Sequence, residues 1–83
     1  MLHMIDVTYA KTRRDEALAY FQEHGMTHYN GDLVIKGLWV CTNQCLAYVL
    51  VEASDPIEVD RACEKLRQFG EVDHRAVISS DEI

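Results

Sequence analysis

The chain has 83 residues, 14 of them acidic and 8 basic, so it has the length of one domain and a net charge of −6. Its basic residues are scattered, which argues against nucleic acid and against an anionic membrane surface as partners. No apolar run approaches the roughly 20 residues of a membrane span, and the amino-terminal pattern is not that of a signal peptide. We therefore expect a single domain over residues 1–83 in the cytoplasm, and three cysteines, an odd number, fit that reducing compartment.

Apolar periodicity divides the chain into four strands and two helices. The predicted elements are, in chain order, a strand at Met1–Tyr9, a helix at Thr12–His24, strands at Leu33–Cys41 and Cys45–Glu52, a helix at Pro56–Phe69 and a strand at Val72–Ile78. This βαββαβ order is typical of the ferredoxin-like α+β fold.

The first strand alternates with a period of two, so its side chains separate into two faces. The more apolar face, which we expect beneath the helices, carries His3, Ile5, Val7 and Tyr9. The opposite face carries Leu2, Met4, Asp6 and Thr8, which places an acidic residue in the middle of a strand.

Each predicted helix has a capping residue and one apolar stripe. Thr12 is the expected N-cap of the first helix with Asp15 as its partner, and Ser54 or Asp55 is the expected N-cap of the second. Gly25 is the expected end of the first helix. The stripes are Ala17, Leu18 and Phe21 in the first helix, and Val59, Ala62, Cys63, Leu66 and Phe69 in the second.

The two middle strands face each other across a tight turn. The second strand contains Gly37, and a glycine within a strand often marks a bulge or a close approach by another group. The turn is Thr42–Gln44, and the following strand is the most continuous apolar run, as in a strand buried on both faces.

Connection rules predict a four-stranded antiparallel sheet with its strands in the order 4-1-3-2 and both helices on one face. The other face then exposes several large apolar side chains, more than a monomer usually tolerates. We therefore expect a homodimer that joins two uncovered sheet faces around a barrel-like space.

Two segments resemble the dimeric α/β-barrel superfamily. They are Lys36–Trp39, and the apolar run Ala47–Glu52 that leads through Ala53–Asp55 into the second helix. Within this superfamily, they resemble a small bacterial family of unknown function with a Gly-x-Trp strand. The superfamily includes isomerases, cofactor-free monooxygenases and haem-degrading enzymes. The resemblance implies the ferredoxin-like fold, a dimer, and a site in the cavity or at the dimer interface.

Asp6, His74 and Arg75 lie on neighbouring predicted strands. Alternation places only one of His74 and Arg75 on the face of Asp6. An Asp–Arg pair is an ion pair bordering the interface, whereas an Asp–His pair is a general acid–base couple. The alternation of the strands is compatible with either pair.

Aromatic residues suggest the walls of a cavity. Trp39, two residues after Gly37, is the best candidate, with Tyr48 on the neighbouring strand. Our leading hypothesis is that the dimer binds a small, partly apolar molecule, without a cofactor. Asp6 and His74 are the candidate acid–base residues of isomerase-like or monooxygenase-like chemistry, and Arg75 is the candidate ligand for an anionic group.

Cys41 and Cys45 support an alternative. If Thr42–Gln44 forms a three-residue turn, the two thiols are cross-strand neighbours that bind Cu or Zn or form a reversible disulfide. His24, His28 and His74 are the candidates for the remaining metal ligands. A third possibility is a structural or regulatory dimer without a ligand.

Overall fold

The computed structural model describes residues 1–24, 28–29 and 33–83. Its elements are β1 (Leu2–Tyr9), the 3-10 turn η1 (Lys11–Arg13), α1 (Arg14–His24), β2 (His28–Tyr29), β3 (Leu33–Val40), β4 (Leu46–Ala53), α2 (Pro56–Leu66), β5 (Gly70–Val77) and the 3-10 turn η2 (Ser80–Glu82). The predicted ferredoxin-like α+β architecture is confirmed by this order of elements.

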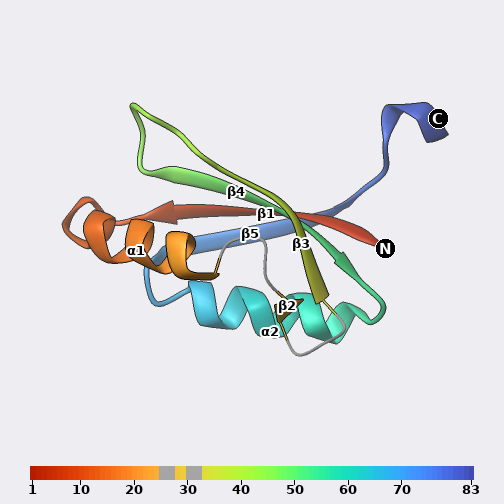
Figure 1. Cartoon of the computed structure of the whole chain (residues 1–83), viewed down its shortest axis with the longest axis horizontal. Coiled ribbons are helices and arrows are strands. Elements are labelled where there is room, and N and C mark those ends of the chain that lie inside the picture. The colour runs from red at the N-terminus through yellow and green to blue at the C-terminus, as the bar shows by residue number, and fades with distance from the viewer. Residues whose placement is uncertain (25–27, 30–32) are drawn as a thin grey trace.

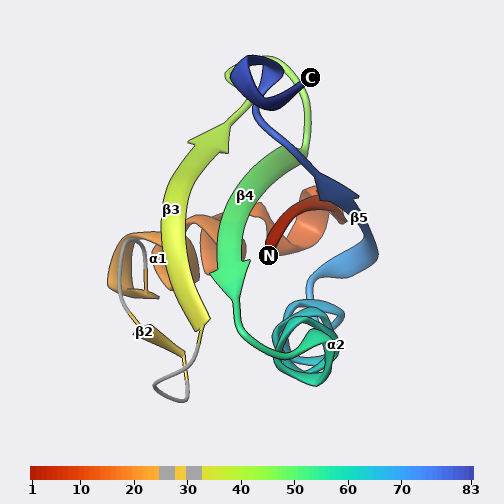
Figure 2. The same ribbon diagram turned by 90° about the vertical axis from the view of Figure 1, so that its right-hand side faces the viewer.

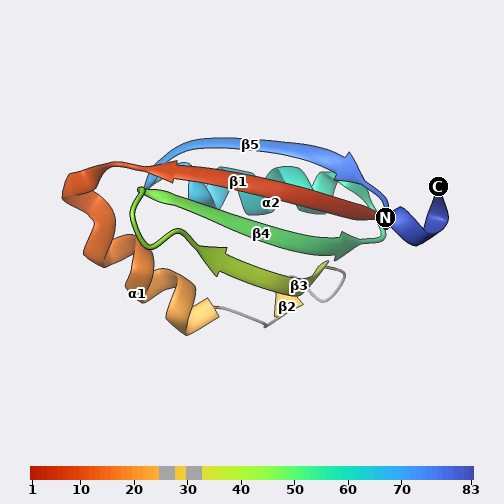
Figure 3. The same cartoon turned by 90° about the horizontal axis from the view of Figure 1, so that it is seen from above.

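The sheet is antiparallel, with the strand order β2-β3-β4-β1-β5. The predicted order 4-1-3-2 is therefore confirmed for the four long strands, which lie side by side in Figure 3. The short strand β2, which lies in the predicted connection, is an addition at the outer edge of β3.

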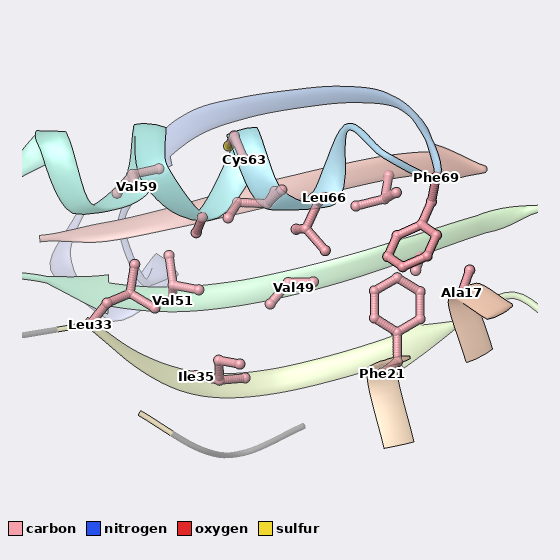
Figure 4. Packing of buried hydrophobic residues seen from close by; sticks show 14 of the residues in the cluster. Ala17, Phe21, Leu33, Ile35, Val49, Val51, Val59, Cys63, Leu66 and Phe69 are labelled. Carbon is pink, nitrogen blue, oxygen red and sulfur yellow. The ribbon is translucent and has the colours of Figure 1, made fainter. Parts of the chain in front are cut away.

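Both helices lie on one side of the sheet (Figures 1 and 2). The core between helices and sheet contains the predicted face of β1, with Ile5 and Val7 fully buried, and the predicted stripes of both helices. Figure 4 shows Leu66 of α2 directed at β4, with Phe21 of α1 against Phe69. Because Cys63 is buried in this core, its thiol packs as a small apolar side chain, as expected, and burial raises its pKa to about 11.

The helix starts differ from one another. Asp55 caps α2 as predicted, because its side chain accepts a hydrogen bond of 3.0 Å from the Ile57 amide. The prediction of Thr12 as the cap of α1 is wrong: Thr12 lies inside η1, which follows Ala10 without a side-chain cap and continues directly into α1. The predicted helix end at Gly25 lies outside the described residues.

Within the described part of the chain, no helix is long and apolar enough to cross a membrane.

The opposite side of the sheet carries no helix in the described part of the chain (Figures 1 and 3). The β3–β4 hairpin rises above this side at one end, and η2 rises above it at the other end (Figure 1). In the single chain the predicted third strand, β4, is buried on one face only, because its alternate side chains face this uncovered side and are half-buried.

Candidate functional site

We call the uncovered side of the sheet the open face and define its residues from the strand register, since paired residues of an antiparallel sheet point to the same side. The open face consists of Leu2, Met4, Asp6 and Thr8 of β1, Val34, Gly37 and Trp39 of β3, Leu46, Tyr48, Leu50 and Glu52 of β4, and Glu71, Asp73, Arg75 and Val77 of β5. Its apolar members are absent from the core cluster between sheet and helices. They are therefore available to another molecule.

A β-bulge in β3 determines which side chains reach the open face. Ile35 pairs with Val51 and Gly37 pairs with Leu50, so Lys36 is an extra residue in β3. In a regular strand without a bulge, Trp39 would share the face of Ile35 and point into the core, because the side chains of a strand alternate. The bulge turns Trp39 outward, where its side chain is 55% exposed. The structure therefore contains the β-bulge that Gly37 indicated in the sequence.

Three candidate site residues form one row across the open face. Trp39 pairs with Tyr48, and Tyr48 pairs with Asp6 on the next strand. The row ends at Asp73, which pairs with Asp6 from β5. An aromatic pair therefore adjoins a pair of carboxylates in the middle of an otherwise largely apolar surface.

Arg75 lies beside this row and forms an ion pair with Asp6. The Arg75 Nη2 atom is 3.2 Å from Asp6 Oδ2, so the Asp–Arg alternative is the one that the fold realises. The other carboxylate oxygen, Asp6 Oδ1, is buried and has no hydrogen-bond partner. A buried acceptor without a donor destabilises the isolated chain. A donor from another molecule would satisfy it once the Asp6 carboxylate turns towards the open face.

His74 does not join this group. It pairs with Ile5 and therefore points to the helix side of the sheet, where its Nε2 atom is 3.5 Å from Asp60 Oδ1 of α2. Its ring lies 5.6 Å from that of the buried His3. The hypothesis of an Asp6–His74 couple is therefore wrong, because the backbone of the sheet separates the two side chains.

The two hairpin cysteines are not cross-strand neighbours. The Cys41 amide donates to the Leu46 carbonyl oxygen at 2.9 Å, so Cys41 faces Leu46 while Cys45 belongs to the loop. Both thiols are free and half-buried. The predicted pairing fails because the loop is one residue longer than the three-residue turn on which it depended.

No metal centre is found in the described part of the chain, where no three histidine, cysteine, aspartate or glutamate side chains are grouped to hold an ion. The side chains of His24 and His28, two of the candidate ligands, lie outside that part. His74 faces Asp60 rather than either hairpin cysteine.

Sequence reasoning missed two members of the open face that affect its charge. Asp73 lies directly opposite Asp6, and Glu71 opposite Thr8, which makes the β5 edge acidic apart from Arg75. The alternation of Glu71, Asp73 and Arg75 in the last strand was the signal that could have placed all three on one face.

Comparisons with known proteins identify the family of the chain and a solved structure of similar fold. A family model with the description "Domain of unknown function (DUF3303)" matches residues 1–83. The solved structure of an uncharacterized NIPSNAP domain protein from Burkholderia xenovorans is similar in fold, with a TM-score of 0.61 and 11% sequence identity over 95% of this chain and 94% of that chain. No curated protein matches the chain significantly.

Proposed function

Because the chain belongs to the DUF3303 family, whose description names no activity, we propose a function from the geometry of the open face. Two copies join their open faces and bind a small, partly apolar molecule between them. The observation that carries this proposal is the row Trp39–Tyr48–Asp6, an aromatic wall that adjoins a carboxylate with one unpartnered oxygen on an uncovered sheet face.

The dimensions of the open face suit a second copy. Four strands of eight residues, spaced about 4.8 Å apart, give a flat footprint of roughly 500 Å². Side chains project from this plane, so the accessible area approaches the ~800 Å² per partner of a stable interface. In a dimer with two-fold symmetry the open face of each copy covers the open face of the other, so no third molecule is needed.

The distribution of side chains on the open face also favours a second copy. Most of its apolar members, among them Met4, Tyr48 and Leu50, lie on the two central strands, which also carry Asp6 and Glu52. The other charged members, Glu71, Asp73 and Arg75, lie along the edge strand β5. An apolar centre with a polar rim is the usual anatomy of a protein interface. A chain of this size also has a small core of its own, so dimerisation adds needed stability.

Within the proposed dimer the ligand contacts each group according to its chemistry. The flat rings of Trp39 and Tyr48 pack against an unsaturated or aromatic skeleton. The side chain of Arg75 is 60% exposed and binds an anionic substituent of the ligand. Asp6 accepts a hydrogen bond from the ligand, or takes a proton from one of its carbon atoms and returns it to another, which is the acid–base step of an isomerase-like reaction that uses no cofactor. In a monooxygenase-like reaction the deprotonated ligand would instead pass its electrons to dissolved O2.

A charged residue in the middle of the open face tests the assembly. We expect Leu50→Asp to convert the dimer to a monomer, because the new carboxylate would be buried without a partner in the interface. Ile57→Asp is the matched control: Ile57 is 49% exposed in the first turn of α2, on the other side of the sheet. Sedimentation velocity that finds both variants equally dimeric contradicts the proposal.

An aromatic anion tests the ligand site. The probe is 8-anilinonaphthalene-1-sulfonate, which has a fused ring for the aromatic wall and a sulfonate for Arg75. We expect saturable binding that quenches Trp39, the only tryptophan, and that weakens about tenfold in Arg75→Gln. Arg67→Gln, which removes an ion-paired arginine from the end of α2, is the control. Equal binding by both variants, or no saturable binding, contradicts the site.

A further inference from the structure

A recess separate from the open face lies at one end of the sheet, between the start of α1 and the β3–β4 hairpin. These two segments are neighbours at the left of Figures 1 and 3. The recess has a volume of about 240 Å³ and is lined by Lys11, Arg14, Thr42, Asn43, Gln44 and Cys45. It is smaller than the 300–1,000 Å³ of a typical site for a drug-sized ligand, so it suits a small group.

The recess gathers cations that have no ion pair. Four arginines of the chain are paired with carboxylates, namely Arg13 with Glu16, Arg61 with Glu58, Arg67 with Glu64, and Arg75 with Asp6. Lys11 and Arg14 have no such partner within residues 1–24, 28–29 and 33–83, and no acidic side chain lines the recess. Two unpaired cations that line one recess make it locally positive in a chain of net charge −6, although Asp15 and Glu16 follow in the first turn of α1.

Three of the remaining lining residues carry side chains that can donate hydrogen bonds. Thr42 has a hydroxyl, and Asn43 and Gln44 have amides. The first helical turn lies in the same wall, and Ala10 provides no side-chain cap for it. The positive end of the helix dipole therefore adds to the field of Lys11 and Arg14.

We propose that this recess binds a phosphate group. A phosphate carries nearly two negative charges at neutral pH, which matches the two unpaired cations. The Arg14 guanidinium offers a planar fork to two phosphate oxygens, and Lys11 acts as a point charge. The group arrives either as free inorganic phosphate or as a phosphomonoester whose organic part stays outside the recess.

An NMR titration of the ¹⁵N-labelled full chain tests the proposal. Inorganic phosphate and phenyl phosphate are added separately, with sodium chloride at matched ionic strength as the reference. We expect saturable shifts in the amides of residues 11–14 and 42–45 with at least one of the two phosphates and none with chloride. A tenfold lower Kd for phenyl phosphate identifies a phosphomonoester as the source, and similar values identify the free anion.

Charge removal distinguishes a built site from general attraction of anions. We expect Lys11→Gln combined with Arg14→Gln to weaken phosphate binding at least tenfold. Lys36→Gln removes an exposed lysine from the β3 bulge instead and is expected to leave the Kd unchanged within twofold. The proposal is overturned if no saturable shift occurs, if the shifts lie outside the recess, or if Lys36→Gln weakens binding as much as the double substitution. All three substitutions are at exposed positions, and amide spectra without phosphate verify that the variants are folded.

Discussion

The indole ring of Trp39 lies directly on Gly37, two residues earlier in the same strand. A Cβ atom placed on Gly37 would approach Trp39 Cζ3 to 2.8 Å and Cζ2 to 2.9 Å, closer than atoms tolerate. The ring therefore occupies the space that the missing side chain leaves, and Gly37 is buried although it lies on the open face. The close approach by another group that a glycine within a strand indicates is therefore made by the tryptophan of the same strand.

Gly37→Ala is predicted to displace the ring of Trp39 and leave the fold intact. The clash involves the far end of a half-exposed side chain, so rotation of the ring relieves it at a cost of about 1 kcal/mol or less in unfolding free energy. We expect a shift in tryptophan emission and a weaker dimer. The control is a double-mutant cycle: in a Trp39→Ala background, Gly37→Ala should no longer weaken the dimer. A full effect of Gly37→Ala in that background would show that the ring contact is irrelevant.

Gly70→Ala is predicted to be far more damaging. Gly70 pairs with Tyr9 across β5 and β1, and an added Cβ would collide with the Thr8 carbonyl oxygen and lie 2.8 Å from Tyr9 Cα. Backbone atoms cannot rotate away, so the strands must separate locally. We expect a loss of about 3 kcal/mol in chemical denaturation, at the upper end for overpacking. A loss as small as that of Gly37→Ala would contradict this close approach of the two strands.

The two helix starts give a matched pair of substitutions. Asp55→Ala removes the side-chain cap of α2 and is predicted to cost about 1 kcal/mol of unfolding free energy. Thr12→Ala removes a hydroxyl that caps nothing and is predicted to change stability by less than about 0.5 kcal/mol. Urea denaturation of both variants measures the difference. If Thr12→Ala costs as much as Asp55→Ala, the assignment of the α1 start is wrong.

Stability is predicted to fall in alkali because of Cys63. Burial raises the pKa of its thiol from 9.0 to about 11, so between these values the unfolded chain loses a proton that the folded chain keeps. The folded state is therefore favoured fully below pH 9, and this contribution declines as the pH rises towards 11. The loss amounts to about 2–3 kcal/mol.

Comparison with Cys63→Ala isolates this thiol from the other ionisable groups of the chain. We expect the variant to be less stable at pH 8 but to lose less stability between pH 9 and pH 11. Parallel curves for the two proteins would show that the Cys63 thiol does not control the alkaline loss.

The fold was predictable because each element has a clear period. Alternation in β1 separated Ile5 and Val7 from Asp6, and the helical spacing from Val59 to Phe69 identified the buried face of α2. Phe69 lies beyond the last helical residue, Leu66, yet it stays buried because its amide donates to the Leu66 carbonyl oxygen and continues the turn. Local patterns therefore predicted the faces of elements better than their ends.

The candidate site was predictable only in part. Alternation required that Asp6 face either Arg75 or His74, but the choice depends on the register between β1 and β5, which pairs Asp6 with Asp73. The outward position of Trp39 depends on the extra residue Lys36, and the separation of Cys41 from Cys45 depends on the length of one loop. These properties arise from contacts between strands, so no single segment of the sequence determines them.

The association state of the reduced protein at micromolar concentration tests the central claim, that a second copy covers the open face, most directly. Native mass spectrometry reports this state together with the mass of any bound molecule. The proposal predicts a species at twice the chain mass of 9.5 kDa, which Leu50→Asp converts to a monomer and Ile57→Asp does not. A spectrum that contains only the 9.5 kDa species would contradict the claim.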